Sequence, residues 1–327
     1  MSSTELIEVV VTSLTREARD INSYEFRLRE DGQGLPPRDL PPFTAGAHID
    51  LHLPNGMVRS YSLSNPQTER HRYVVTVALD PKTRGGSRFM HEALKVGDIL
   101  PISPPRNNFP LNENAAHTLL IGGGIGITPL WCMAQRLRDL GRSWELIYCT
   151  RTHELTAFLG TLEALKEKSN ANIRFNFDGE PGGKMLDIAA TLEKVAPDTH
   201  IYCCGPGPML AAFEKAAAGR PEGHVHVEYF TASDAPATKG GFTVVLQRSG
   251  KELFIEEGKS ILDSVLDLGV DTPYSCMEGT CGECVTRVIS GVPDHRDVFL
   301  TKEERAANDR MTICCSGSKS EKLVLDL

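Results

Sequence analysis

The stretch that decides the fold is Tyr274-Ser-Cys-Met-Glu-Gly-Thr-Cys-Gly-Glu-Cys284, together with the distant Cys314. Its cysteines, Cys276, Cys281, Cys284 and Cys314, follow the spacing Cys-x4-Cys-x2-Cys-x29-Cys. Three thiolates on one tight loop with a remote fourth are typical of a plant-type [2Fe-2S] cluster. Glycines between the ligands let the backbone approach and donate N–H groups to the sulfurs. The spacing therefore predicts a one-electron iron–sulfur centre.

Two alternatives accompany this prediction. A zinc site or a set of buried structural thiols also uses cysteine, but zinc sites generally show two short Cys-x2-Cys pairs.

The remaining cysteines leave open questions. Cys315 adjoins Cys314, so the identity of the fourth ligand is ambiguous. Cys203 and Cys204 pose a similar problem, and burial in a strand is the simpler role for Cys203. Cys132 and Cys149 are interpreted as core residues.

Length and composition bound the class of protein. A chain of 327 residues predicts two or three domains, and contents of 40% hydrophobic and 24% charged residues are typical of soluble globular proteins. No apolar run approaches a membrane span, and the start of the chain shows no secretory signal. Nine cysteines, an odd number, favour a reducing cytoplasm. A net charge of −8 without a basic block argues against nucleic-acid binding.

The pattern along the chain divides it into three domains. Short strands at 7–14, 24–28, 48–53 and 73–79, separated in part by Pro- and Gly-rich breaks, predict a small antiparallel barrel. Strands near 118–121, 145–148, 173–177 and 200–203 alternate with helices near 129–140, 155–168 and 184–195, which predicts a parallel sheet covered on both faces. A hairpin at 242–247 and 252–256 and a helix at 260–268 precede the cysteine loop. The expected boundaries are 1–112, 113–230, a small-residue linker at 231–240, and 241–327.

Two segments of the expected barrel can bind a flavin nucleotide. Arg59-Ser-Tyr-Ser-Leu-Ser-Asn65 combines a cation, an aromatic hydroxyl and small hydroxyls, although an ordinary surface strand can read the same way. Gly85-Gly-Ser87 leads into a helix, where glycine backbone at the helix N-terminus makes a natural phosphate cradle. A glycine turn that only caps the helix is the alternative. The two segments together favour a flavin ring and its phosphate.

Two glycine-rich turns in the expected parallel sheet can bind a dinucleotide. They are Gly122-Gly-Gly-Ile-Gly-Ile-Thr-Pro129 and Cys203-Cys-Gly-Pro-Gly-Pro-Met209, and each follows a strand and precedes a helix. Ligands of α/β sheets bind at the carboxyl ends of the strands, so both turns should face one crevice. The regular Gly-x-Gly-x-x-Gly fingerprint is missing, and a structural tight turn remains the alternative.

The ordered set Arg-x-Tyr-Ser-Leu, Gly-Gly-Ile-Gly-Ile-Thr-Pro, Cys-Gly-Pro and the four-cysteine pattern resembles the phthalate dioxygenase reductase family. The resemblance extends to Gly291-Val-Pro-Asp-His-Arg-Asp297 and to the closing Lys322-Leu-Val-Leu-Asp-Leu327. It implies an antiparallel β-barrel domain that binds FMN, an α/β parallel-sheet domain that binds NADH, and an α+β (β-grasp) ferredoxin domain. It also implies a terminal Rieske-type oxygenase as the protein that accepts the electrons.

The resemblance assigns site residues one by one. FMN is favoured over FAD because adenine-binding features are not identifiable, and the implied FMN contacts are Arg59, Ser60, Tyr61, Ser62, Gly85, Gly86, Ser87 and Phe230. Phe230 has the alternative of a plain core aromatic at a strand end. The implied NADH contacts are Gly123, Gly124, Thr128, Cys204, Gly205 and Pro206. The family ending places Cys314 on the cluster and turns Cys315 the other way, as alternation along a strand would.

The choice of pyridine nucleotide depends on Asn176-Phe-Asp-Gly-Glu180, whose acidic groups would repel a 2′-phosphate. We expect Asp178 to meet the adenine ribose of NADH. Arg151 is a further candidate contact to the nucleotide. It is also an argument against the preference for NADH, since an arginine could bind the 2′-phosphate of NADPH.

The parts predict an electron route from NADH through FMN and the [2Fe-2S] cluster to an external protein, with no acid–base residue required. Residues 239–327 carry 15 acidic and 11 basic side chains, so an acidic face could steer toward a basic partner, or merely keep the domain soluble. Alternative destinations are an O-demethylase, a monooxygenase or a dehalogenase. A free-standing NADH oxidase and a redox-sensing regulatory protein are further alternatives. We expect a cytoplasmic monomer.

Overall fold

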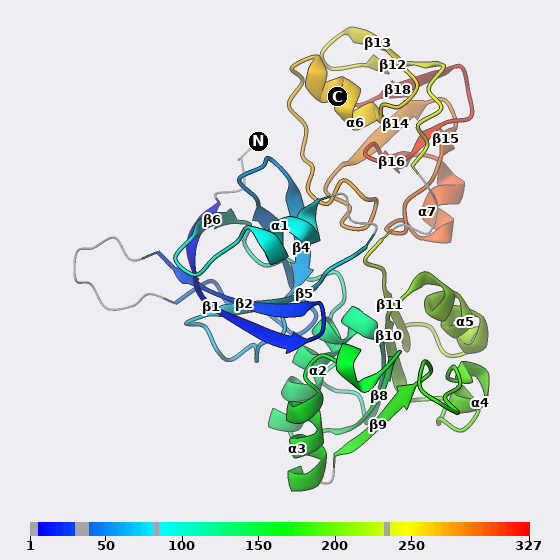
Figure 1. The fold of residues 1–327 in the computed structure, drawn as a ribbon. Coiled ribbons are helices and arrows are strands. Elements are labelled where there is room, and N and C mark those ends of the chain that lie inside the picture. The colour runs from blue at the N-terminus through cyan, green and yellow to red at the C-terminus, as the bar shows by residue number, and fades with distance from the viewer. Residues whose placement is uncertain (1–5, 30–38, 82–84, 170, 232–235) are drawn as a thin grey trace. The chain divides into compact units, whose positions relative to one another are not determined.

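The protein is described from a computed structural model that covers residues 6–29, 39–81, 85–169, 171–231 and 236–327 (Figure 1). It divides into two compact units, Met1–Glu228 and Tyr229–Leu327. None of the helices in these ranges combines the length and apolar character that crossing a bilayer requires.

The first sheet is antiparallel and has the strand order β4-β3-β6-β1-β2-β5. An isolated bridge between Leu63 and Val75 joins the segment after β4 to β5, so the two edge strands meet and the sheet closes into the predicted barrel. Val9, Val11 and Phe26 fill its interior and are fully buried. The elements described in this part are β1 Ile7–Ala18, β2 Ile21–Leu28, β3 His48–His52, β4 Val58–Ser62, β5 Tyr73–Ala78, α1 Gly86–Glu92 and β6 Ile99–Ile102.

The second sheet belongs to the same unit and is entirely parallel, with the order β11-β10-β7-β8-β9. In Figure 1, α2 and α3 cover one face of it and α4 and α5 the other, which explains why β7 is an almost continuous buried run. Its elements are β7 His117–Gly123, η1 Gly124–Gly126, α2 Ile127–Asp139, β8 Ser143–Thr150, η2 His153–Leu155, α3 Leu159–Ser169, β9 Asn172–Phe177, α4 Ile188–Leu192, β10 His200–Cys204, α5 Gly207–Ala217 and β11 Val225–Glu228.

The third sheet makes up the second unit and has the order β13-β12-β18-β14-β16, with β15 and β17 paired beside it. Capping boxes at Ser260 and Thr301 start its two helices, and α6 buries Ile261, Leu262 and Val265 in the core of the unit. This is the expected β-grasp arrangement. The elements are β12 Phe242–Leu246, β13 Lys251–Ile255, α6 Ile261–Asp267, β14 Val285–Ser290, β15 Pro293–Asp294, α7 Lys302–Ala307, β16 Arg310–Thr312, β17 Gly317–Ser318 and β18 Lys322–Leu325.

Two predicted helices were too long. The helix expected from residue 155 begins at Leu159, because Phe158 has a positive φ of 60° and residues 153–155 form a 3-10 turn. The helix expected at 184–195 is only Ile188–Leu192, and it starts where the Asp187 side chain accepts a hydrogen bond from the backbone N–H of Ala190.

The expected linker at 231–240 lies partly outside the described residues, which omit 232–235. Its remaining part packs on the second unit: the N–H of Ala237 donates to the carbonyl of Cys315, and the carbonyl of Thr238 accepts from Gly258. The boundaries between the three domains stay a prediction.

Candidate functional site

The four cysteines of the opening motif form two pairs, and Cys315 adjoins one of them. The Cys276 thiol hydrogen-bonds the Cys281 thiol, and the Cys314 thiol hydrogen-bonds the thiols of both Cys284 and Cys315. All four side chains are buried. Within the described ranges, no three His, Cys, Asp or Glu side chains converge on a single metal position. A [2Fe-2S] cluster needs four thiolates, two for each iron, and this division into two pairs fits it.

The backbone of the cysteine loop also fits a cluster. Gly279 and Gly282 have φ values of 72° and 80°, and Met277 has 55°, so the chain turns sharply between the ligands. Its N–H groups point at sulfur: Glu278 donates to Cys276 Sγ at 3.3 Å, and Cys276 donates to Cys281 Sγ at 3.5 Å. Such donors stabilise negative charge on thiolate ligands.

The strand alternation expected at Cys315 was wrong. β16 ends at Thr312, so Cys314 and Cys315 lie in a turn and strand alternation does not apply to them. The Cys315 thiol lies 3.3 Å from Thr312 Oγ1 and packs against the cysteine loop, where a Cβ on Gly279 would come within 2.5 Å of it. Both cysteines are therefore close to the proposed cluster, and Cys314 as the fourth ligand stays a prediction.

The expected flavin residues gather around β4 and the start of α1. The Arg59 side chain lies against the first turn of α1. Its Cγ and Nε atoms are so close to Gly86 that a Cβ on this glycine would be 2.7 Å from each of them. Gly85 caps this helix with a φ of 104°, and Ser87 Oγ accepts a hydrogen bond from the N–H of Asp80 at 3.2 Å. A guanidinium beside a glycine-rich helix start suits a phosphate.

The other three residues of β4 differ in their surroundings. Burial raises the pKa of Tyr61, so its phenol stays neutral. Ser62 is buried at the strand end. The Ser60 hydroxyl donates to Asp50 at 2.6 Å, so its side chain is engaged within the barrel and only its backbone remains for a ligand.

The two glycine turns of the parallel sheet touch each other. β7 and β10 are neighbours, and Gly122 pairs with Cys204. A Cβ on Gly126 would lie 2.3 Å from the carbonyl oxygen of Cys204, and one on Gly123 would lie 2.7 Å from Pro206. The glycines therefore allow a backbone approach that no side chain permits. Gly124 has a φ of 54°, and Thr128 is buried with its hydroxyl donating to the carbonyl of Ile125.

Arg151 and Asp178 lie just after neighbouring strands, β8 and β9, at the same edge of the sheet. Their side chains are 3.8 Å apart, and that of Arg151 is 75% exposed. Next to them His153 pairs with Glu180 and stacks on Phe177 with a centroid separation of 3.8 Å. The structure thus brings the two predicted residues together, and it adds His153, which sequence reasoning left out, to the acidic segment at 176–180.

Comparison with known proteins agrees with this geometry. A family model described as an oxidoreductase NAD-binding domain matches residues 120–215, and one described as a 2Fe-2S iron-sulfur cluster binding domain matches residues 244–318. Tetrachlorobenzoquinone reductase of Sphingobium chlorophenolicum is 49% identical over 98% of each chain. Vanillate O-demethylase oxidoreductase of Pseudomonas putida is 44% identical over 98% of this chain and 100% of its own.

A solved structure of phthalate dioxygenase reductase, described as a modular structure for electron transfer from pyridine nucleotides to [2Fe-2S], matches with a TM-score of 0.77. It is 40% identical, and the match covers 98% of both chains. The chain belongs to the phthalate dioxygenase reductase family. The resemblance inferred from the motifs is thereby confirmed, and so is the predicted fold class.

Sequence reasoning missed Glu228 of this reductase. Glu228 pairs with Cys204 across β10 and β11, so its carboxyl adjoins the predicted nicotinamide side of the site. Its Oε2 atom is buried without a hydrogen-bond partner among the described residues, although the residue as a whole is partly exposed. Burial raises the pKa of the Glu228 carboxyl to about 8. Burial also raises the pKa of the Cys204 thiol, and the nearby charge of Glu228 raises it further. A single glutamate in a short strand forms no motif, so only the three-dimensional neighbourhood identifies it.

The E228Q variant is expected to stabilise the reductase above pH 5 and to flatten its pH dependence. The pKa of this carboxyl is about 8 in the folded chain against an ordinary value of 4.5, so stability falls as the pH rises through this window. A shift of this size is worth at most about 5 kcal/mol. The check is the urea midpoint at pH 5, 6.5 and 8, with the exposed Glu222→Gln as control. Parallel curves for wild type and E228Q would contradict the assignment.

Phe230 belongs to the second unit, which begins at Tyr229. Its role beside the flavin ring stays a prediction.

Proposed function

We propose that the protein is the NADH-dependent reductase component of a multicomponent Rieske-type aromatic-ring oxygenase. The observation that carries this proposal is the presence, in one chain, of a flavin-type barrel, touching nucleotide turns and a four-thiol cluster loop. Membership of the phthalate dioxygenase reductase family supports it. The chain binds FMN, uses NADH and carries a [2Fe-2S] cluster.

When bound, FMN and the cluster convert the two-electron hydride of NADH into single electrons. The chain's own residues bind and orient these groups. Arg59 and the N–H groups of residues 85–87 hold the FMN phosphate, with residues 59–62 along the flavin ring. Cys276, Cys281, Cys284 and Cys314 ligate the irons. No residue is needed as a general acid or base.

The nucleotide turns receive NADH. Gly123, Gly124 and residues 204–206 provide backbone N–H groups and room for the pyrophosphate and nicotinamide, and Thr128 flanks them. Asp178 binds the adenine ribose, and its carboxylate, with that of Glu180 nearby, disfavours a 2′-phosphate. The Arg151 side chain lies 3.8 Å from the Asp178 carboxylate, and the negative charge of that carboxylate supports the preference for NADH.

The electron acceptor is a terminal oxygenase protein. The reductase components among its relatives support such a partner, while the substrate of the oxygenase is bound by the partner and not by this chain. None of the nine cysteines, all of which lie in the described ranges, forms a disulfide, which supports the cytoplasm as the compartment, and we propose a monomer.

Anaerobic titration with NADH, followed by visible absorbance and EPR, tests the internal route. Flavin bleaching together with one rhombic reduced [2Fe-2S] signal per chain is the expected result. A reduced flavin beside an oxidised cluster would contradict the order of carriers, and well-folded protein without a flavin spectrum would overturn the reductase function.

A second candidate acceptor is a chlorinated benzoquinone, because a relative named tetrachlorobenzoquinone reductase is 49% identical over 98% of this chain. A steady-state assay with tetrachlorobenzoquinone and with a purified Rieske oxygenase decides between the two. Faster turnover with the oxygenase supports the proposal, whereas activity with the quinone alone favours the second function.

Replacing Arg59 with alanine is expected to weaken FMN binding by about 10- to 100-fold, because one charge-assisted phosphate contact is worth roughly 1.5–3 kcal/mol. The fluorescence of released FMN on dilution measures this. Arg29→Ala is the matched control, since Arg29 is exposed and paired with Glu8 at the far end of β2. Equal retention of FMN by both variants would remove Arg59 from the site.

A further inference from the structure

A cleft that the proposed electron route does not use lies between the barrel and helix α2. Its volume is about 240 Å³. Strands β1, β2 and β5 contribute Glu17, Glu25 and Val74, and the segment joining β4 to β5 contributes Ser64 and Arg72. Trp131 and Gln135 of α2, with Phe158, form the opposite wall. All of these residues belong to the first unit.

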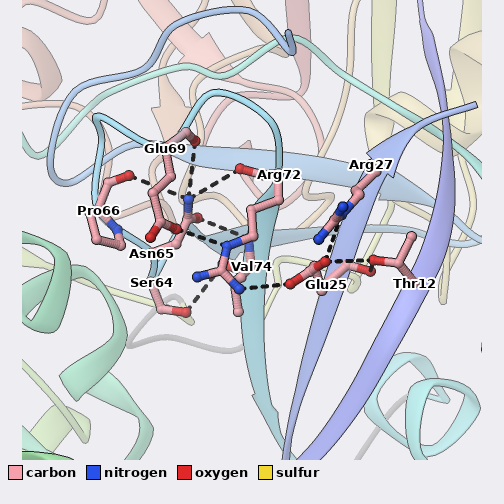
Figure 2. A network of polar contacts seen from close by, with 9 residues as sticks. All are labelled: Thr12, Glu25, Arg27, Ser64, Asn65, Pro66, Glu69, Arg72 and Val74. Carbon is pink, nitrogen blue, oxygen red and sulfur yellow. Dashed lines mark hydrogen bonds and ion pairs between the residues drawn. The ribbon is translucent and has the colours of Figure 1, made fainter. Parts of the chain in front are cut away.

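One wall of the cleft carries a network of hydrogen-bonded charged side chains (Figure 2). The carboxylate of Glu25 accepts from Arg72 Nη1 at 2.7 Å and from Arg27 Nε and Thr12 Oγ1 at 2.8 Å. Burial alone would raise the pKa of Glu25, but these hydrogen bonds lower it to about 2. Arg72 is in turn shared with Glu69 at 2.8 Å. The positive charge of Arg72 is therefore already committed to two carboxylates.

A second carboxylate in the cleft is not compensated. Glu17 is half-buried and, among the described residues, makes no ion pair or hydrogen bond. Glu25 is paired with both Arg27 and Arg72, so the excess negative charge of the lining comes from Glu17. In a confined space of reduced dielectric, such a site attracts a cation.

Gln135 adds a directed acceptor. It is only 7% exposed, and its Nε2 donates to the carbonyls of Ser64 at 2.9 Å and of Trp131 at 3.1 Å. Two carbonyl acceptors fix which end of the amide is nitrogen, because an oxygen there would face oxygen. Gln135 Oε1 accepts from no other residue in the described part of the chain, and because Gln135 lines the cleft this atom is available to a donor there.

The aromatic wall is held in a strained conformation. The rings of Trp131 and Phe158 stack with centroids 6.0 Å apart at 27° and are only 7% and 8% exposed. Phe158 has a φ of 60°, a left-handed conformation that is rare for a large side chain. Strain of this kind costs on the order of 1–3 kcal/mol and is concentrated at functional sites.

We propose that this cleft binds a guanidinium group. A guanidinium is planar, stacks on aromatic rings and presents several N–H donors at once. The N–H groups of a guanidinium can donate to Gln135 Oε1 and to the Glu17 carboxylate, for which the described residues provide no donor. Its positive charge compensates the negative charge of the cleft. The same chemistry occurs in free guanidines and in an arginine side chain on a protein surface.

Binding is measured at Trp131 itself, in the holoprotein and without NADH, so the result is independent of the electron route. The chain has two tryptophans, and a Trp144→Phe variant labelled with 5-fluorotryptophan gives one ¹⁹F NMR signal from Trp131. We expect ethylguanidinium chloride to shift this signal saturably, while its neutral analogue ethylurea and sodium chloride do not. A non-saturating shift, or an equal shift with ethylurea, would overturn the proposal.

The charge requirement is tested by Glu17→Gln, which should weaken ethylguanidinium binding by about tenfold, as expected for an interaction of about 1.4 kcal/mol. Glu8→Gln is the matched control on the same strand, since Glu8 is exposed and paired with Arg29 outside the cleft. Identical titrations of the E17Q and E8Q variants would overturn the assignment. Binding of an end-blocked Gly-Arg-Gly peptide as tightly as ethylguanidinium supports an arginine side chain as the ligand, and exclusion of the peptide supports a free guanidine.

Discussion

Electron delivery to a protein acceptor is expected to fall on the order of a hundredfold or more when Cys281 is replaced by serine, because a serine hydroxyl is a much poorer iron ligand than a thiolate. NADH oxidation with ferricyanide, which takes electrons from the flavin, should remain close to wild type. The two rates, measured with cytochrome c and with ferricyanide, separate the cluster from the flavin. The reduced [2Fe-2S] EPR signal should disappear in parallel. Intact delivery in this variant would show that the electrons bypass the cluster.

The turn after β16 provides a matched pair of controls for this prediction. Cys314→Ser should resemble C281S, whereas Cys315→Ser should keep the cluster and the cytochrome c activity. Both thiols are buried and adjacent, so general damage to the unit would affect them alike. Loss of the EPR signal in C315S with retention in C314S would reverse the assignment of the fourth ligand.

Alanine at Gly126 is expected to raise the KM for NADH by about tenfold or more and to destabilise the first unit by about 1–3 kcal/mol. The added Cβ would lie 2.3 Å from the carbonyl oxygen of Cys204 and 2.7 Å from the backbone nitrogen of Gly205. Both atoms are backbone and cannot rotate away, so the two nucleotide turns must separate. Steady-state KM with ferricyanide and the thermal midpoint measure the two effects.

Gly207→Ala is the matched control. Gly207 follows the same Cys-Gly-Pro turn and begins α5, and a Cβ there meets nothing within 4 Å. Its KM and melting temperature should stay close to wild type. An unchanged KM in G126A would mean that close contact of the turns is not needed for NADH binding.

Features that depend on residues close together in the chain were predictable from the sequence. The cysteine spacing and the glycine turns need particular residue types at fixed intervals, and the alternation of strand and helix patterns predicted the barrel, the parallel sheet and the β-grasp unit. The two turns were expected at one crevice, and the structure shows them in direct backbone contact.

Features that depend on neighbours from distant segments were not predictable. The burial that shifts the pKa of Glu228 comes from the surroundings of two strands, and the cleft beside Trp131 is lined by three strands and a helix. Local conformation also led to wrong predictions. Phe158 takes a left-handed φ that its residue type disfavours, so the start of α3 was placed too early, and the turn at Cys314 was read as a strand.

The bridge between Leu63 and Val75 has a consequence for handling the protein. It joins the segment after β4 to β5, so part of the edge of that sheet is paired within the chain. The β-grasp sheet, in contrast, ends in β13 and β16. The exposed charges of Lys251 and Glu252 disfavour pairing of β13 with a strand of another molecule, but Phe254 on the same strand is 62% exposed. We therefore expect aggregation during expression to begin at β13, and a charged residue at position 254 to raise the soluble yield.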